Sequence, residues 1–311
     1  MYKVLKKLLK HGQYYCVYPS AYVETTRQPY TPEVHRVRYE DVELTTSDGV
    51  VLRCFLLKPR EDPTRRIRAT VIMFLGNAME IGGYAELLIG KMYYRMRCNV
   101  LMVSYRGYGL SKGTPSEKGL RRDAQAALDH VISQPQLAKY PVVAYGLSLG
   151  GAVAIDLTNR NPTKISALIV ENTFTSLPDV VHGWPLIGLF SVFCHQKWKS
   201  SARIGSIPPK LPILFLSGRL DQVVPPKHME LLFELALLRG HDPKAPAKPS
   251  NTSFVALAAF EPFPWGSHAD TWDQLGYSSI VTGFLDRDDI QKSKKKDSES
   301  PSTAPEQSSA P

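Results

Sequence analysis

The sequence contains few cysteines and no long apolar run, and each shortage excludes a class of protein. Its four cysteines, Cys16, Cys54, Cys98 and Cys194, lack the paired spacing of a metal site. In a chain of 311 residues they predict free thiols rather than a disulfide framework. No stretch approaches the ~20 apolar residues of a membrane span, and no continuous apolar core of a secretory signal lies near the start.

The chain has fewer acidic residues than basic ones. It contains 29 aspartates and glutamates and 38 lysines and arginines, which gives a formal net charge of +9. The excess lies at the two ends, in residues 1–12 and 292–296. No aromatic residues interleave a basic patch and no zinc-finger spacing is present, so we expect no nucleic-acid partner. Basic ends bind anionic surfaces or remain solvated.

Residues 1–20 predict a basic amphipathic N-terminal segment. Wound as a helix, the segment gathers Leu5, Leu8 and Leu9 on one face and its lysines on the other. This pattern is typical of a short helix on a membrane surface, and equally of an amphipathic helix packed on its own domain. An anionic membrane surface is therefore a candidate partner of residues 1–12.

The rest of the chain predicts one domain and a tail. Residues 30–286 carry a regular succession of strand and helix patterns, and a chain of this size accommodates one large core. Within them, residues 241–252 are rich in proline and lysine and predict a surface insertion. Residues 287–311 have almost no apolar side chains and predict a disordered tail.

Apolar patterning predicts eight strands separated by helices. The first two strands flank Ser47-Asp48-Gly49, a hairpin turn signal, whereas the later ones are apolar runs followed by helical periodicity. Repeated strand–helix units predict an α/β fold with a mostly parallel eight-stranded central sheet, helices on both faces and no large cap domain. The expected strands are residues 35–45, 50–58, 69–75, 99–104, 141–145, 166–171, 211–217 and 253–260, and the main expected helices are 117–132, 149–159, 227–239 and 271–285.

The most informative motif is Gly146-Leu147-Ser148-Leu149-Gly150, which stands between an apolar strand and an alanine-rich helix. A serine on such a turn adopts a strained, positive-φ conformation that only small neighbours tolerate. The helix that follows directs its first N–H groups at an oxyanion beside the serine. The motif predicts that Ser148 is a nucleophile; the alternative is a plain glycine-rich turn.

A serine nucleophile needs a general base, and the base needs an orienting carboxylate. Asp221 and His268 each follow a predicted strand, at the sheet edge where a parallel sheet gathers its working residues. We therefore expect a Ser148–His268–Asp221 triad. Glu171, at a strand end, is an alternative acid, and Asp270 lies too near His268 in sequence to reach its far nitrogen. The histidines that fit less well, by helix position or chain order, are His228, His182 and His195.

Two further sets complete the expected site. An oxyanion hole needs two N–H donors, which we expect from the backbones of Leu149 and Asn77. Four apolar residues near the same edge are candidates to line an acyl pocket, although each is equally a candidate core residue: Ile81, Phe174, Trp184 and Trp265.

Together these motifs resemble the α/β-hydrolase superfamily, and more narrowly the bud-emergence-suppressor-like serine hydrolases of fungi and their plant and animal relatives. The resemblance covers residues 17–285. It is carried by Tyr18-Pro19-Ser20, Leu44–Gly49, Tyr105–Ser111, Gly113–Glu117, the Ser148 motif, Glu171–Ser176 and Asp221–Pro225.

The resemblance implies an α/β-hydrolase fold, no metal or organic cofactor, and association with a membrane on the cytoplasmic side or at the endoplasmic reticulum; without that association the protein would be cytoplasmic. It also implies a lipid or thioester substrate, since animal relatives are protein depalmitoylases. The sequence departs from the family at Leu75, usually His, and at Ala269, usually Asn, and it shows only the basic segment where relatives have an apolar one.

These observations predict a serine esterase or thioesterase, with palmitoyl-protein hydrolase as one concrete form. Ser148 would attack the carbonyl of a lipid-like or acylated-protein substrate, and His268 would then activate water to release the acid. The alternatives are a non-catalytic, membrane-associated scaffold in cell polarity and a serine peptidase of the same fold.

Overall fold

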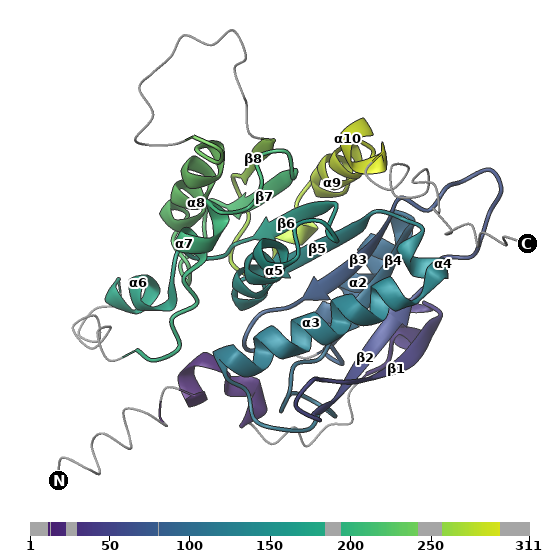
Figure 1. The fold of residues 1–311 in the computed structure, drawn as a ribbon, viewed down its shortest axis with the longest axis horizontal. Helices are drawn as coiled ribbons and strands as arrows, with labels where there is room; N and C mark the ends of the chain where they lie inside the picture. The colour runs from purple at the N-terminus through teal and green to yellow at the C-terminus, as the bar shows by residue number, and fades with distance from the viewer. Residues whose placement is uncertain are drawn as a thin grey trace, which may run out of the picture.

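The computed structural model describes residues 12, 14–22, 30–79, 81–183, 194–241 and 257–292. Within them one sheet has eight strands in the order β1-β2-β4-β3-β5-β6-β7-β8 (Figure 1). The strands are β1 (Tyr39–Thr45), β2 (Val51–Leu57), β3 (Ala69–Phe74), β4 (Cys98–Val103), β5 (Val142–Leu147), β6 (Ala167–Glu171), β7 (Ile213–Gly218) and β8 (Ala258–Phe263). The helices are η1 (Pro19–Ala21), η2 (Pro32–His35), α2 (Tyr84–Arg95), α3 (Glu117–Ser133), α4 (Pro135–Ala138), α5 (Leu149–Arg160), α6 (Leu177–His182), α7 (Ser200–Ile204), α8 (Lys227–Leu237), η4 (Thr271–Asp273), α9 (Tyr277–Leu285) and α10 (Asp288–Gln291).

The sheet changes from antiparallel to parallel at β4. β1 pairs antiparallel with β2, which pairs antiparallel with β4, and every later pair is parallel. The five parallel pairs place the carboxyl ends of β3 to β8 at one edge of the sheet. This confirms the predicted mostly parallel eight-stranded sheet and defines the edge at which a site is expected.

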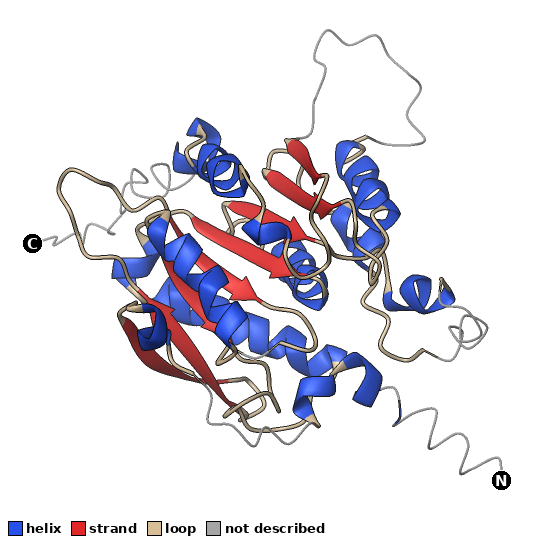
Figure 2. Cartoon of the chain, turned by 180° about the vertical axis from the view of Figure 1, so that it is seen from behind, coloured by secondary structure: helices blue, strands red, loops and turns tan. Residues whose placement is uncertain are grey.

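Helices cover both faces of the sheet (Figures 1 and 2). On one face α3, α5, α7 and α8 pack on a core that includes Leu120, Ile155 and Leu232. On the other face α2, α9 and α10 pack on a core that includes Leu87 and Val281. The central strands β3, β4, β5, β6 and β7 are buried along their whole length, as their apolar runs predict.

The structure corrects several predicted boundaries. The sequence predicts a tail from residue 287, but α10 follows at once and buries Ile290, because this isoleucine joins the apolar core that includes Val281. The last strand begins five residues later than expected, at Ala258. Residues 1–11, most of the expected 241–252 insertion and residues 293–311 lie outside the described residues. In the described segments no helix is long and apolar enough to cross a bilayer.

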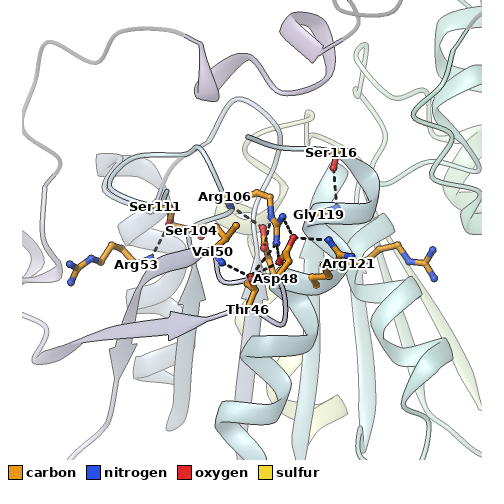
Figure 3. A network of polar contacts seen from close by, with 12 residues as sticks. Thr46, Asp48, Val50, Arg53, Ser104, Arg106, Ser111, Ser116, Gly119 and Arg121 are labelled. Carbon is orange, nitrogen blue, oxygen red and sulfur yellow. Dashed lines mark hydrogen bonds and ion pairs between the residues drawn. The ribbon is translucent and has the colours of Figure 1, made fainter. Parts of the chain in front are cut away.

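A buried ion network fastens the loop after β4 to the hairpin turn and to α3 (Figure 3). The Arg106 guanidinium donates to Asp123 Oδ1 at 2.8 Å and to both carboxylate oxygens of Asp48 at 2.8 and 2.9 Å. The backbone N–H of Arg106 donates to Asp123 Oδ2 at 2.9 Å. Since Asp123 is fully buried and Arg106 is 5% exposed, each charge depends on the others for stabilisation.

We expect Arg106→Met to lower the free energy of unfolding by about 3–5 kcal/mol, because it leaves the Asp123 carboxylate buried without its partner. The matched control is Arg122→Met, which removes a half-exposed arginine from the same Asp48 carboxylate and should cost less than about 1 kcal/mol. Urea unfolding of the two variants gives both values. Equal losses would contradict the assignment of the buried pair as the stabilising contact.

Candidate active site

Ser148 lies on a tight turn between β5 and α5. Its backbone has φ +55° and ψ −118°, a strained conformation for a residue with a side chain. There is no room for a larger neighbour, because a Cβ on Gly146 would lie 2.1 Å from the Gly150 carbonyl oxygen, and one on Gly150 would lie 2.0 Å from that of Phe74. The sequence motif therefore forms the strained turn that it predicts.

The turn presents the Ser148 hydroxyl to a histidine and an aspartate from two other loops. His268 Nε2 lies 2.9 Å from Ser148 Oγ, and His268 Nδ1 lies 2.7 Å from Asp221 Oδ2. Ser148 is 7% exposed, the Asp221 side chain is 1% exposed and the His268 side chain is 19% exposed. The structure thus brings the three predicted residues into one Ser–His–Asp triad, a hydrogen-bond relay from Ser148 through His268 to Asp221.

The Asp221 carboxylate is held by its own loop. Its Oδ1 atom accepts the backbone N–H groups of Val223 and Val224 at 2.9 and 2.8 Å, which leaves Oδ2 directed at His268. The loop therefore fixes the direction that an orienting acid needs.

Asn172 was not among the predicted site residues. It connects the loops that carry Asp221 and His268. Its side-chain amide donates to the backbone oxygens of Ser267 and His268 at 2.9 and 3.1 Å, and to Thr271 Oγ1 at 3.0 Å. Its Oδ1 atom accepts the N–H of Gly218 at 2.8 Å. One side chain thus joins the ends of β6, β7 and β8. An asparagine directly after a strand-ending acid is the signal that could have indicated it.

The competing acids and bases are engaged elsewhere. Glu171 Oε2 accepts the hydroxyls of Tyr145 and Tyr277 at 2.9 and 2.6 Å, and Asp270 accepts the N–H of Ser267. His228 Nδ1 lies 2.9 Å from Thr175 Oγ1. Among the contacts that the structure describes, His268 bonds Asp221 rather than Glu171 or Asp270.

Leu149 directly follows the serine, and the loop that carries Asn77, the other expected oxyanion donor, passes near it. Leu149 is the first residue of α5, where a helix has no intrahelical acceptor for its N–H. A Cβ built on Gly76 would lie 3.7 Å from Ser148 Cβ, so the loop that carries Asn77 passes against the nucleophile. Leu75 is buried in this loop. The loop is therefore placed to supply the second N–H.

Three of the four expected acyl-pocket residues lie in the part of the chain that the structure describes, and these three do not share one pocket. Phe174 and Ile81 are 3% and 6% exposed and belong to the cores on opposite faces of the sheet. Trp265 is 78% exposed, and Trp184 lies outside the described residues. Their expected place near one edge of the sheet does not determine which face each side chain takes, because a loop residue can turn to either side.

Glu171 is a buried acid directly behind the nucleophile. Its backbone oxygen accepts the N–H of Ser148 at 2.9 Å, and its side chain has no exposed surface. Burial raises the pKa of the Glu171 carboxyl from 4.5 to about 7, against the opposing effect of the two tyrosine hydroxyls. The folded protein therefore holds a proton here that the unfolded chain loses at lower pH.

We expect the wild type to lose stability relative to Glu171→Gln as the pH rises from about 4.5 to about 7. Over that interval the folded carboxyl keeps its proton while the unfolded carboxyl loses it, so a rising pH favours the unfolded state. Above about pH 7 both carboxyls are ionised, and the difference in stability between the two proteins stays constant. Urea unfolding from pH 4.5 to 8 measures it. Parallel stability curves for the two proteins would contradict a raised Glu171 pKa.

Comparison with known proteins identifies close relatives over nearly the whole chain. Protein bem46 of Schizosaccharomyces pombe is 41% identical over 278 residues, covering 88% of this chain and 86% of the relative. The α/β-hydrolase domain-containing protein WAV2 of Arabidopsis thaliana is 38% identical, covering 86% and 85%. A Saccharomyces cerevisiae relative described as a membrane protein is 37% identical, covering 89% and 90%.

Family and structural comparisons agree with these relatives. A family model described as serine aminopeptidase, S33, matches residues 65–197. An α/β hydrolase from Vibrio vulnificus superposes with a TM-score of 0.68 at 17% identity, covering 89% of this chain and 93% of that structure. The Pyrococcus furiosus esterase Pf2001 gives 0.63 at 20% identity, covering 82% and 93%. Its eight-stranded sheet and its relatives together show that this chain belongs to the α/β-hydrolase family that includes bem46 and WAV2.

Proposed function

We propose that this protein is a serine hydrolase that cleaves carboxylic ester or thioester bonds through an acyl-enzyme on Ser148. The observation that carries the proposal is the relay of 2.9 and 2.7 Å contacts from Ser148 through His268 to Asp221, on a strained turn. Membership of the α/β-hydrolase family and the fold shared with an esterase support it.

The proposed reaction has two steps. Ser148 Oγ attacks the substrate carbonyl while His268 Nε2 accepts the hydroxyl proton, and Asp221 stabilises the imidazolium. The N–H groups of Leu149 and Asn77 stabilise the tetrahedral oxyanion, which collapses as His268 returns the proton to the leaving alcohol or thiol. His268 then deprotonates a water that attacks the acyl-enzyme, and the acid is released with Ser148 restored.

Lipid-like molecules and acylated proteins are the proposed substrates, with palmitoyl-protein hydrolysis as one form. Thioesters suit this mechanism, because a thiol is a better leaving group than an amine. The S33 family description supports testing a peptidase activity beside it. A series of acyl esters and thioesters of increasing chain length, with an aminoacyl anilide alongside, distinguishes these substrates; faster cleavage of the anilide would replace the ester assignment.

We expect a fluorophosphonate probe to label the folded wild type on Ser148, because the relay activates its hydroxyl. Ser148→Ala should abolish labelling, and His268→Ala should slow it by about a thousandfold or more. Mass spectrometry of the labelled peptide identifies the site, and circular dichroism checks that each variant is folded. A folded wild type that takes no label would favour the non-catalytic scaffold instead.

We also propose that residues 1–12 attach the protein to an anionic membrane surface, in keeping with the relative described as a membrane protein. Each lysine near such a surface contributes about 1 kcal/mol, so deleting the segment should release the protein from phosphatidylserine vesicles. Replacing Lys3, Lys6, Lys7 and Lys10 with glutamine separates charge from apolar contact. Vesicle sedimentation measures both, and binding unchanged by the deletion would contradict the proposal.

A further inference from the structure

Two buried tyrosines donate hydrogen bonds to the loop that passes against Ser148. The hydroxyl of Tyr105 donates to the backbone oxygen of Leu75 at 3.0 Å, and that of Tyr108 donates to the backbone oxygen of Asn77 at 2.8 Å. Both tyrosines are 1% exposed and follow β4 rather than β3. The loop is therefore held from a neighbouring strand.

The two acceptors flank the peptide that carries the Asn77 N–H. The Leu75 oxygen belongs to the peptide before it and the Asn77 oxygen to the peptide after it. Peptide units are planar, so fixing the direction of a carbonyl fixes its whole unit. With both neighbouring units fixed, the rotation of the central N–H has little freedom. An oxyanion donor needs this fixed direction, because its benefit comes from being oriented before the charge develops.

The tyrosines are themselves rigidly placed. Their rings meet edge to face at a centroid distance of 5.5 Å, and the Tyr105 ring stacks on Phe74 at 6.5 Å. Between them in sequence, Arg106 is bound to Asp48 and Asp123 in the network of Figure 3. Because the two hydroxyls bond the loop, the position of the loop depends on the buried network of Arg106, Asp48 and Asp123.

The protonation of both hydroxyls is also secure. Burial raises the pKa of Tyr105 and of Tyr108 above the ordinary value for a phenol. Neither group loses its proton in the range where a histidine base works, so both remain donors throughout it.

We propose that Tyr105 and Tyr108 are positioning residues for the oxyanion hole and set the direction of the Asn77 N–H through the carbonyls on either side of it. The proposal rests on the proposed function and deepens it. The hydroxyls of the two tyrosines bond the loop and not Ser148, so they act through the loop.

The test compares Tyr108→Phe and Tyr105→Phe with Tyr18→Phe in the full chain. Tyr18 is the matched control, because it is fully buried in the same core and its hydroxyl donates to Gln196 Oε1 at 3.0 Å rather than to the loop. For p-nitrophenyl acetate we expect kcat to fall about tenfold in Tyr108→Phe with KM changed less than twofold, since a misdirected donor weakens only the transition state. Tyr18→Phe should leave kcat unchanged.

Two further readouts separate positioning from general destabilisation. The inhibition constant of a trifluoromethyl ketone, whose adduct places an oxyanion in the same hole, should rise by the factor by which kcat/KM falls. Amide hydrogen exchange in residues 75–79 should speed up several-fold in the two loop variants and not in Tyr18→Phe.

The outcomes distinguish this inference from the proposed function. If the wild type hydrolyses the ester and Tyr108→Phe matches Tyr18→Phe in kcat, inhibition and exchange, the positioning role is wrong while the hydrolase stands. If the wild type neither hydrolyses esters nor takes a serine label, the hydrolase is wrong. Exchange that is then faster only in the loop variants would still support the positioning of this loop, and unchanged exchange would overturn that too.

Discussion

The structure of the site depends on the close approach of the first turn of α5 to the ends of β3 and β5. The Cβ positions of Gly146 and Gly150 would fall about two ångströms from backbone atoms, so the helix can start here only if both residues lack side chains. That approach forces Ser148 into a positive φ, and its hydroxyl lies 2.9 Å from His268 Nε2. The strain is local, and buried contacts on either side of the turn hold it in place.

Those contacts form two clamps built on different chemistry. On one side Asn172, which also has a positive φ, joins the loops of Asp221 and His268 through its side-chain amide. On the other side two tyrosine hydroxyls hold the loop of Asn77. Each clamp uses neutral buried donors, whose hydrogen bonds cost little to desolvate compared with charges and have well-defined directions. The two clamps thus add to the hydrogen bonds that Asp221 and His268 make themselves.

Local patterns in the sequence predicted much of this arrangement. The turn that carries Ser148 is encoded by the five residues 146–150. Asp221 and His268 each follow an apolar strand, so chain order and sheet topology bring them together. The parallel sheet follows from apolar runs such as Ala69–Phe74.

The parts that depend on side-chain direction were beyond these patterns. Ile81 and Phe174 are both apolar residues in loops near the site, yet they pack on opposite faces, and Trp265 is exposed. The roles of Asn172, Tyr105 and Tyr108 depend on contacts with residues that are distant in the sequence or lie on another strand. Ile290 likewise lies in a polar stretch of sequence, and only the structure shows that it is buried in the core.

The central claim is that Ser148 carries the acyl group, and pre-steady-state kinetics tests it most directly. Mixing the protein with p-nitrophenyl acetate should release a burst of p-nitrophenol close to one equivalent when deacylation is the slower step. Rapid acid quenching and mass spectrometry should then locate one acetyl group on the peptide that contains Ser148. An acetyl group found only on other residues, or no trapped acetyl group with a strictly linear time course, would contradict the account.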